Sequence, residues 1–482
     1  MLILSGRLAP MPIERIVIVG GGVAAWLAAL TLAAKTSCAV ILVDSGGIDD
    51  SLGLPVAIEA SLPSVAELHA RLDIDEDHMV AHTGSSYGLG RALSNWRAAG
   101  AVAFHPYGEV GANLGPVAFH HLMARMRADG ATINLANYSV GALCAQTGRF
   151  APYKGDGRSV LSTMAHGLHL HVDGYRHYLQ NAAKQRGVSV IEGDLEDVHF
   201  DTKDRIGSVR LSSGQVVEGD FFLDCSGQAR LLASHMPGYA FEDWSAWLPH
   251  NHMRVSVTPS NSPPPLYAHI EAHEDGWQRF LSCQDRVEEL VISRGAGSGT
   301  AGSYTFTNGR IATPWAGNCL AIGGAAAVIE PVASTQLHLV ATALSRLLDL
   351  FPHSLESSVE ASEYNRQTIE QLENARDYAI LHFVQKDASA PPVPERLAHR
   401  LSAYEASGRV ALYDEESFET WDWIALFEAL DIRPRRYDVV ANGIARDAIA
   451  AHFERVRSVM LKAVSSLPQQ QSYLQSLKAI AA

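Results

Sequence analysis

The stretch RIVIVGGGVAAWLAALTLAA, residues 15–34, constrains the fold of this chain more than any other. Residues 16–19 form a short apolar, β-branched run that is typical of a buried strand. Gly20, Gly22 and Ala25 follow in a G-x-G-x-x-A spacing and lead into an Ala- and Leu-rich helix. The first glycine permits the tight turn, the second lets the backbone approach a pyrophosphate, and the alanine lets helix and strand pack closely. The pattern therefore predicts a dinucleotide-binding turn.

The helix after the turn begins with Val23 and Ala24, whose backbone N–H groups we expect to donate to a phosphate. A second strand is predicted over residues 39–43 and ends in Asp44, a carboxylate about 20 residues beyond the turn that is able to accept from a ribose hydroxyl. A merely structural glycine-rich turn is the alternative. Because strand, helix, second strand and acid occur in order, we expect an α/β, Rossmann-like fold that binds a dinucleotide.

Composition narrows the class of protein. The chain has 482 residues, 47% of them hydrophobic, so it is able to bury a large core. Its formal net charge of −14 argues against nucleic acid or an anionic membrane surface as the main partner. The five cysteines show no C-x-x-C spacing, which fits a reduced cytoplasm and predicts no metal site. No stretch reaches the ~18 apolar residues of a membrane span, so we expect a cytoplasmic protein without a membrane partner.

Two later turns are candidates for closing the dinucleotide site. FFLDCSG, residues 221–227, is an apolar strand that ends in Asp224 and a turn of small residues. Residues 319–331 form another apolar strand that ends at Gly323, and a long helix is predicted after Pro331. We expect the start of that helix to face the pyrimidine side of a flavin and to offer N–H donors to it.

A second G-x-G-x-x-G spacing occurs at Gly297, Gly299 and Gly302. No helix is predicted after it, because a polar, strand-like run follows. We therefore interpret it as a flexible hairpin loop and not as a second nucleotide site. A chain with one such site is not expected to bind and oxidise a nicotinamide cofactor by itself.

Taken together, the motifs resemble the flavin-dependent tryptophan halogenase family, which is related to the flavin monooxygenases with one FAD domain. The matching stretches span nearly the whole chain in the family's order: GGGVAAW at Gly20, EASLP at Glu59, FHPYG at Phe104, HVDGYRHYL at His171, DCSG at Asp224, WAGNCLAIG at Trp315, IEPVASTQLHL at Ile329, YNRQTIEQLENARDYAILHF at Tyr364 and IRPRRYD at Ile432. The resemblance implies an FAD-binding domain over residues 1–350, with an inserted β-sheet substrate region at about 104–300, and a helical C-terminal substrate or cap region over 351–482.

The resemblance also implies the cofactor and its contacts. FAD, reduced by a separate flavin reductase and passed on transiently or as diffusible FADH2, would react with O2, with chloride or bromide as a further reactant. The residues expected to contact FAD are Gly20, Gly22, Val23, Ala24, Ala25, Asp44, Glu59, Ala60, Asp224, Gly323 and Ser334. For Glu59 the alternative is an ordinary carboxylate near the start of a helix. A halide would lie at the backbone N–H groups of Thr335 and Gln336.

Three signatures of the family are missing. Its F-K-x-G-x-x-F-x-N-W segment places the catalytic lysine at Gly88, and no lysine occurs between Lys35 and Lys154. Its E-P-L-E-S-T-S segment places the catalytic glutamate at Ala333. Its W-x-W-x-I-P motif is here WQRFLS, residues 277–282, with only the first tryptophan kept. The nearby Arg91 is a poor nucleophile, because a guanidinium stays protonated.

These losses favour an FAD-dependent oxidoreductase that acts on an aromatic or indole-like substrate, or a peptide that carries one, over a halogenase of free tryptophan. The candidate catalytic residues are Ser334, Tyr87 and His105, the last with a purely structural histidine as the alternative. The substrate is expected between Tyr87 and the tryptophans Trp277, Trp421 and Trp423, unless these are plain core. Two other hypotheses stay open: a halogenase of another substrate that uses free hypohalous acid, and a non-catalytic FAD-binding protein. A homodimer is also expected.

Overall fold

The computed structural model describes residues 12–47, 49–155, 157–295, 303–354, 358–384 and 392–481. The second glycine spacing, at Gly297, Gly299 and Gly302, lies outside these residues, so the hairpin loop stays a prediction. Within the described ranges no helix is both long and apolar enough to span a membrane.

A six-stranded sheet with the order β20-β21-β12-β1-β2-β8 forms the Rossmann-like unit. Its strands are β1 (Arg15–Val19), β2 (Ala39–Asp44), β8 (Ser189–Glu192), β12 (Phe221–Asp224), β20 (Trp315–Ala316) and β21 (Cys319–Ala321). All pairs are parallel except β20 with β21. Side chains of β1 alternate between two cores: Ile16 and Ile18 pack with helix α1 (Val23–Lys35), whereas Val17 and Val19 pack with a small sheet on the other face. Burial on both faces explains the continuous apolar run of the sequence.

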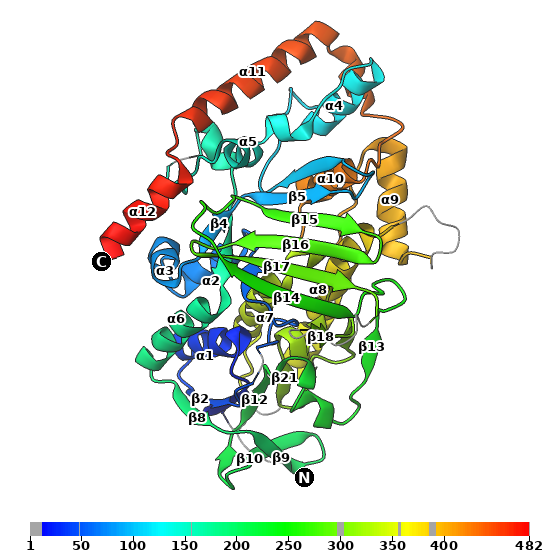
Figure 1. The fold of residues 1–482 in the computed structure, drawn as a ribbon. Coiled ribbons are helices and arrows are strands. Elements are labelled where there is room, and N and C mark those ends of the chain that lie inside the picture. The colour runs from blue at the N-terminus through cyan, green and yellow to red at the C-terminus, as the bar shows by residue number, and fades with distance from the viewer. Residues whose placement is uncertain are drawn as a thin grey trace, which may run out of the picture.

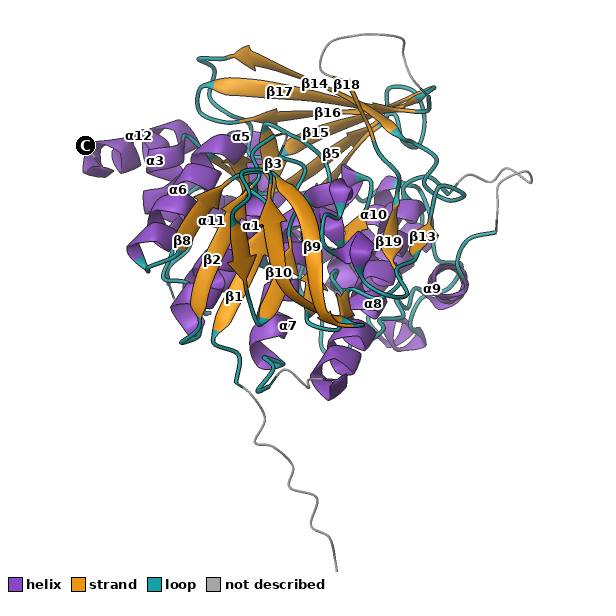
Figure 2. Ribbon diagram, turned by 90° about the horizontal axis from the view of Figure 1, so that it is seen from below, coloured by secondary structure: helices purple, strands orange, loops and turns teal. Residues whose placement is uncertain are grey.

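A seven-stranded sheet with the order β18-β14-β17-β16-β15-β5-β6 lies above the parallel sheet in Figure 1. Its strands are β5 (Gly90–Ser94), β6 (Val102–Pro106), β14 (His252–Pro259), β15 (Ala268–His273), β16 (Gly276–Ser282), β17 (Arg286–Ser293) and β18 (Ser303–Thr305). Two segments far apart in the sequence form this sheet, and the parallel pair of β5 and β15 joins them. Figure 2 shows it along one edge of the molecule, with the parallel sheet and most helices on one side of it.

Three small sheets complete the β-structure of the described residues, in the orders β3-β7-β4, β11-β10-β9 and β13-β19-β22. Their strands are β3 (Ile58–Ala60), β4 (Ser86–Gly88), β7 (Gly167–His171), β9 (Leu195–Thr202), β10 (Arg205–Leu211), β11 (Val216–Glu218), β13 (Phe241–Asp243), β19 (Gly309–Ile311) and β22 (Ala327–Val328). The sheet of β9, β10 and β11 is the one that covers the second face of the parallel sheet.

Helices surround the sheets. The α-helices after α1 are α2 (Val65–Arg71), α3 (Glu76–Thr83), α4 (Phe119–Ala128), α5 (Val140–Thr147), α6 (Val172–Gln185), α7 (Gln336–Asp349), α8 (Ser358–Leu381), α9 (Glu395–Ser407), α10 (Thr420–Ala429), α11 (Arg446–Ser465) and α12 (Gln470–Ala481). The 3₁₀ turns are η1 (Leu135–Tyr138), η2 (Val160–Thr163), η3 (Gly227–Ala229), η4 (Ala233–His235), η5 (Gly323–Ala325), η6 (Pro331–Ala333) and η7 (Val439–Gly443). In Figure 1, α11 crosses above α4 and α5, and α12 returns to lie beside α3.

The predicted α/β class, with a β-rich region and a helical C-terminal region, is confirmed. The domain boundaries stay a prediction, but the β-rich insert is not one continuous piece. Within residues 104–300, β8 and β12 belong to the parallel sheet, while β5 begins at Gly90 and precedes that range. Helix α6 has His171 as its N-cap, whose Nδ1 accepts from the N–H of Gly174 (2.9 Å).

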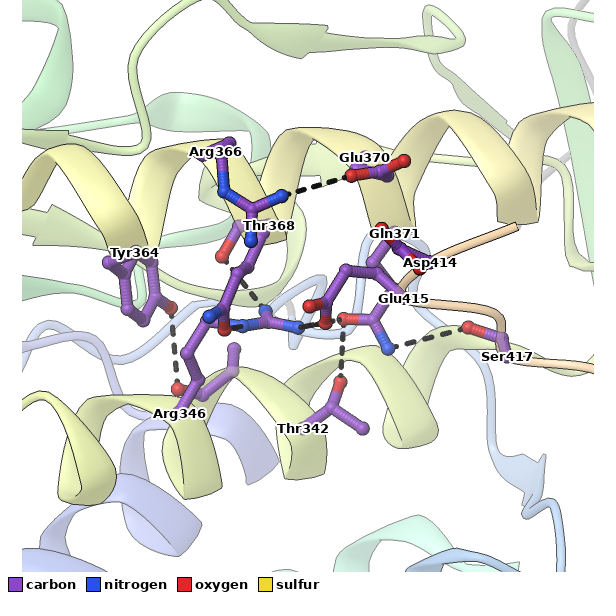
Figure 3. A network of polar contacts seen from close by, with 12 residues as sticks. Thr342, Arg346, Tyr364, Arg366, Thr368, Glu370, Gln371, Asp414, Glu415 and Ser417 are labelled. Atoms are coloured by element: carbon purple, nitrogen blue, oxygen red, sulfur yellow. Dashed lines mark hydrogen bonds and ion pairs between the residues drawn. The ribbon is translucent and has the colours of Figure 1, made fainter.

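Arg346 on α7 lies at the centre of a polar network that ties α7 to α8 and to the loop before α10 (Figure 3). Its guanidinium donates to Oγ1 of Thr368 (2.9 Å), Oε1 of Gln371 (3.2 Å) and Oε2 of Glu415 (2.9 Å). Thr342 donates to the same Gln371 oxygen (3.0 Å). Hydrogen bonds to a buried charge are stronger than neutral ones. The network therefore holds α7, whose first turn carries part of the candidate site.

Candidate functional site

The turn of residues 20–22 joins β1 to α1 in the conformation that the glycine pattern predicts. Gly20 has a φ of +135°, and a Cβ there would lie 2.4 Å from the carbonyl oxygen of Cys225. Gly22 has an ordinary φ of −88°, but a Cβ there would lie 1.9 Å from Oδ1 of Asp49. The backbone conformation therefore requires glycine at position 20, whereas at position 22 glycine leaves space that the side chains of Asp49 and Ser51 fill.

A cavity of about 370 Å³ opens beside this turn. The turn itself, Asp44 at the end of β2, Arg176 on α6 and the Cys225–Ser226 backbone line it. The Asp44 carboxylate accepts from the N–H of Gly46 (3.0 Å) and faces the turn. Glycine turn, helix start and strand-end carboxylate thus meet at one cavity, which is the arrangement that a dinucleotide needs.

The first N–H groups of α1 are not free in this structure. Val23 donates to Oδ2 of Asp49 and Ala24 donates to Oγ of Ser51, each at 3.1 Å. Ala25 has no exposed surface and packs in the main core, as close packing of helix and strand requires. The residues fit a dinucleotide, provided that Asp49 and Ser51 move away from the helix.

Asp224, a predicted cofactor contact, has partners within the protein. Its carboxylate is fully buried and accepts from the N–H and hydroxyl of Ser226 (3.0 and 2.6 Å) and from the N–H groups of Leu232 and Ala233 (2.8 Å each). These four internal donors show that Asp224 shapes the turn after β12, and its contact with the cofactor stays a prediction. Gly323 lies in a left-handed conformation, with a φ of +66°, and a Cβ there would lie 2.2 Å from the carbonyl oxygen of Ser51.

A group of unpartnered polar atoms lies where α7 begins. Ser334 has a φ of +57° and is fully buried, and its Oγ has no protein partner. Oγ1 of Thr335, the N-cap residue of α7, and Oε1 of Gln336 are also buried without a partner. Such atoms cost about 1–3 kcal/mol each when nothing binds them, and the first N–H groups of a helix have no partner within it. These atoms fit a flavin carbonyl or an anion, and the predicted contacts stay a prediction.

The position of the family's lysine is filled by a histidine. A Cβ on Gly88 would lie 2.7 Å from Nε2 of His169, which faces it from the paired strand β7. Burial lowers the pKa of His169 to about 4, so the ring is neutral. Lys154 does not reach this space, because its ammonium pairs with Asp77 (2.7 Å) and its side chain is 74% exposed. Lys386 lies outside the described residues.

The position of the family's glutamate is also without a carboxylate. Ala333 has no exposed surface and packs in the main core. Glu330, three residues earlier, points elsewhere: its Oε1 accepts from Nε1 of Trp277 and lies 2.8 Å from Nδ1 of His250. Glu330 therefore anchors the turn η6 to β16 through Oε1.

Arg91 and His105 are neighbours across β5 and β6 and point toward α8. Arg91 donates to the carbonyl of Val332 (3.0 Å) and to the hydroxyl of Tyr378 (3.2 Å), and Nε2 of His105 lies 2.7 Å from the same hydroxyl. Burial lowers the pKa of His105 far below its usual value, so His105 is neutral, with Nδ1 unpartnered. These contacts connect His105, through Tyr378 and Arg91, with the turn that carries Ser334.

Tyr87 does not join this group. It alternates with Gly88 along β4 and therefore points to the opposite face of that strand. Its hydroxyl donates to Oδ1 of Asp77 (2.5 Å), which also accepts from Tyr473 of α12 (2.8 Å). The predicted catalytic role of Tyr87 finds no support in this geometry, since its one polar group binds α3.

Arg279 replaces the second tryptophan of the W-x-W-x-I-P motif and forms a buried ion pair. Its Nη2 donates to Oε1 of Glu288 (3.2 Å), and both side chains have no exposed surface. Glu59, on the neighbouring strand β3, has an unpartnered buried Oε1. Burial raises the pKa of Glu59 to about 7, and Glu288 adds to the rise while Arg279 opposes it. Glu59 and Ala60 are buried as a cofactor contact requires, and their role stays a prediction.

Glu59 is expected to make the protein less stable as pH rises from about 4.5 to 7. Its pKa is higher in the folded chain, about 7, than the ordinary 4.5, so in this window the folded chain holds a proton that the unfolded chain releases. The free energy of unfolding should fall by about 3 kcal/mol and then level off. Urea denaturation across this range, compared with Glu59→Gln, isolates the effect from the buried histidines. Parallel curves for the two proteins would contradict it.

Gly88→Ala is expected to lower the free energy of unfolding by about 1–3 kcal/mol, because the new methyl group meets the His169 ring. In a His169→Ala background the same change should cost clearly less. A double-mutant cycle by chemical denaturation measures this coupling. Gly443→Ala is the control, since no atom lies within 4 Å of the position that its methyl group would take. Additive costs would show that the ring does not fill the lysine's space.

The tryptophans expected around a substrate are mostly core. Trp277 and Trp423 have no exposed surface. A cavity of about 740 Å³ instead lies against β5 and β6, with the rings of Phe104 and Tyr267 in its wall. Phe104 alternates with His105 along β6, so this cavity is on the opposite face from Arg91 and His105.

The fold and the site define a flavoprotein oxidoreductase with one Rossmann-like domain. The family model for tryptophan halogenase matches residues 15–446, so the chain belongs to the tryptophan halogenase family. Membership confirms the predicted resemblance and makes the protein an FAD-dependent enzyme of the halogenase and monooxygenase type.

The chain is similar to several halogenases. It is 28% identical to tryptophan 7-halogenase RebH of Lentzea aerocolonigenes over 415 residues, which cover 77% of this chain and 76% of that protein. Among solved structures, it matches BrvH, a flavin-dependent halogenase from Brevundimonas sp. BAL3, with a TM-score of 0.89 at 26% identity over 96% and 99% of the two chains. Xcc4156, a flavin-dependent halogenase from Xanthomonas campestris, gives 0.89 at 29% identity over 97% and 98%.

Sequence reasoning missed four residues that shape the site. Asp49 and Ser51 lie in an ordinary polar loop, and His169 and Tyr378 lie in patterns that predict only a strand and a helix. The sequence carried no signal for the first three. For Tyr378 the sequence held one indication of a role in the site, since this residue lies in the stretch at Tyr364 that resembles the family.

Proposed function

We propose that this protein uses reduced FAD and O2 to oxygenate an aromatic or indole-like substrate, and that it does not perform the lysine-dependent halogenation of free tryptophan. The observation that carries the proposal is the pair of replaced positions: the His169 ring fills the space beside Gly88, and Ala333 carries no carboxylate. When bound in its reduced form, FAD would react with O2 and supply a two-electron oxidant. In the net reaction, FADH2, O2 and the aromatic C–H give FAD, the hydroxylated ring and one water.

The chain's own residues would hold the reactants. The turn of residues 20–22, the start of α1 and Asp44 would bind the nucleotide part, and the start of α7 would face the flavin. Arg91 fixes η6 through the Val332 carbonyl. Neutral His105 has a free Nδ1 that is able to accept a hydrogen bond. A separate flavin reductase is proposed as the source of FADH2, because the sequence offers one dinucleotide turn. Cytoplasmic location and a homodimer stay predictions.

Ser334→Gly tests whether the Ser334 hydroxyl acts as a proton donor or acceptor in the proposed reaction. Glycine accepts the left-handed backbone at this position, so the variant removes Oγ without adding strain. We expect kcat to fall about tenfold or more, since a positioned proton donor or acceptor contributes at least that much. The melting temperature should stay within roughly a few degrees of wild type. An unchanged kcat would exclude Ser334 from catalysis.

One observation favours a second function, halogenation of another substrate by free hypohalous acid. The buried polar atoms of Ser334, Thr335 and Gln336 still surround the start of α7, where the family binds a halide. In that net reaction, FADH2, O2, a halide ion, a proton and the C–H bond give FAD, the halogenated product and two waters. No lysine is needed if the acid diffuses freely to the substrate.

The two functions differ in their products. Protein loaded with photoreduced FAD is mixed with O2 and indole, with and without bromide, with catalase present to remove free peroxide. A product one oxygen atom heavier, independent of bromide, supports oxygenation. Bromination of indole or of monochlorodimedone supports the second function. Regioselective chlorination of free tryptophan contradicts the proposal, and flavin oxidation no faster than that of free FADH2 contradicts both functions.

A further inference from the structure

The loop of residues 49–53 contacts all three turns at which FAD contacts are expected. At the first turn, Oδ2 of Asp49 accepts from the N–H of Val23, and Oγ of Ser51 accepts from the N–H of Ala24, each at 3.1 Å. The Ser51 hydroxyl in turn donates to Oδ1 of Asp49 (2.7 Å). Asp49 therefore sits as an anion at the start of α1.

The same loop binds the second turn. Oδ2 of Asp50 accepts from the N–H of Gln228 in η3 (3.2 Å) and from the hydroxyl of Tyr304 in β18 (2.6 Å). A Cβ on Gly227 would lie 1.8 Å from Oδ1 of Asp50, so the carboxylate fills the space that the glycine leaves. The Gln228 side chain also donates to the carbonyl of Gly53 (3.2 Å).

The third turn is closed by backbone contact. The Ser51 carbonyl accepts from the N–H of Gly324 in η5 (2.7 Å), and a Cβ on Gly323 would lie 2.2 Å from that oxygen. One short loop thus contacts the glycine turn, the turn after β12 and the turn after β21, and it ties the three turns together.

The Asp49 carboxylate resembles the group that the site would bind. Both are anions that accept from the first N–H groups of a helix and that gain from its dipole. Because Gly22 has no side chain, a pyrophosphate would be able to approach the backbone of the turn. Oδ1 of Asp49 occupies this space, 1.9 Å from where a Cβ on Gly22 would be. The carboxylate and a pyrophosphate would require the same donors and the same space, so only one can be present at a time.

We propose that the Asp49 carboxylate is a built-in competitor of the FAD pyrophosphate at the start of α1 and must be displaced when the cofactor binds. The inference rests on the proposed function, since that function assigns FAD to this groove. A closed state lowers the apparent affinity by the fraction of open molecules. Moderate affinity in turn suits an enzyme that receives FADH2 from a separate reductase and releases FAD after each cycle.

The test is FAD affinity of the purified full chain, measured by quenching of flavin fluorescence. Asp49→Ala is expected to bind FAD about 3- to 30-fold more tightly than wild type, the range that corresponds to removing a carboxylate from a helix start. Asp49→Asn loses the charge but keeps an acceptor, so its affinity for FAD should lie between those of wild type and Asp49→Ala. ADP carries the pyrophosphate without the flavin. Measured by competition with FAD, its affinity should also be highest for Asp49→Ala, intermediate for Asp49→Asn and lowest for wild type.

Asp447→Ala is the matched control, because Asp447 is an exposed carboxylate in the first turn of a different helix, α11. Its FAD affinity should equal that of wild type. If Asp49→Ala binds FAD equally or more weakly while wild type binds it, the inference is wrong and the proposed function stands. If neither wild type nor any variant binds FAD, the proposed function itself fails. Thermal melts of all variants exclude misfolding as the cause of a weaker affinity.

Discussion

Replacing Gly22 with valine is expected to weaken FAD binding at least about a hundredfold while leaving the fold intact. The backbone at Gly22 has a φ of −88°, which valine adopts readily, so the strand–turn–helix unit should still form. The added side chain would enter the space that Asp49 fills in this structure and that a pyrophosphate needs. Flavin fluorescence titration gives the affinity, and circular dichroism with thermal melting gives the state of the fold.

Gly443→Val is the control for this variant, since a Cβ on Gly443 would have no atom within 4 Å. It should bind FAD as wild type does. Tight FAD binding by a folded Gly22→Val protein would move the cofactor to another place and would remove the basis of the proposed function. Gly20→Ala is a poorer test, because its φ of +135° makes loss of stability and loss of binding inseparable.

Glu330→Ala is expected to lower the free energy of unfolding by about 3–5 kcal/mol. Glu330 has no exposed surface, and its carboxylate accepts from the Trp277 indole and lies 2.8 Å from Nδ1 of His250. Alanine would leave two buried donors without an acceptor and would free the start of η6. Because Ser334 follows this turn, FAD affinity and activity should fall as well. Chemical denaturation at constant pH measures the loss of stability.

Glu330→Gln separates the lost hydrogen bonds from the lost volume. Its amide oxygen is able to accept from one of the two donors, so the expected cost is about half that of alanine. Glu274→Ala, an exposed glutamate in the turn between β15 and β16, should change stability by less than about 0.5 kcal/mol. A Glu330→Ala protein as stable as the Glu274→Ala control would show that the buried carboxylate is not an anchor.

Much of the fold could be predicted from local patterns. The strand at 16–19, the turn after it and the helix from Val23 depend on residues within one short stretch, and each occurs as expected. The strand that ends at Asp44 and the long helix after Pro331 also follow from periodicity, although the turn η6 separates Pro331 from α7. The sequence also showed that the family's lysine is missing at Gly88 and its glutamate at Ala333.

Which side chains lie beside Gly88 and Ala333 depends on contacts between segments that are distant in the sequence. The sequence by itself determined the glycine turn and the missing lysine and glutamate, because each is a matter of residue type at a local spacing. Only the tertiary structure placed His169 against Gly88, turned Tyr87 to the other face of β4, and laid Asp49 on the start of α1. Strand register and loop packing decide these neighbours, and a shift of one residue would reverse which side chains face the site.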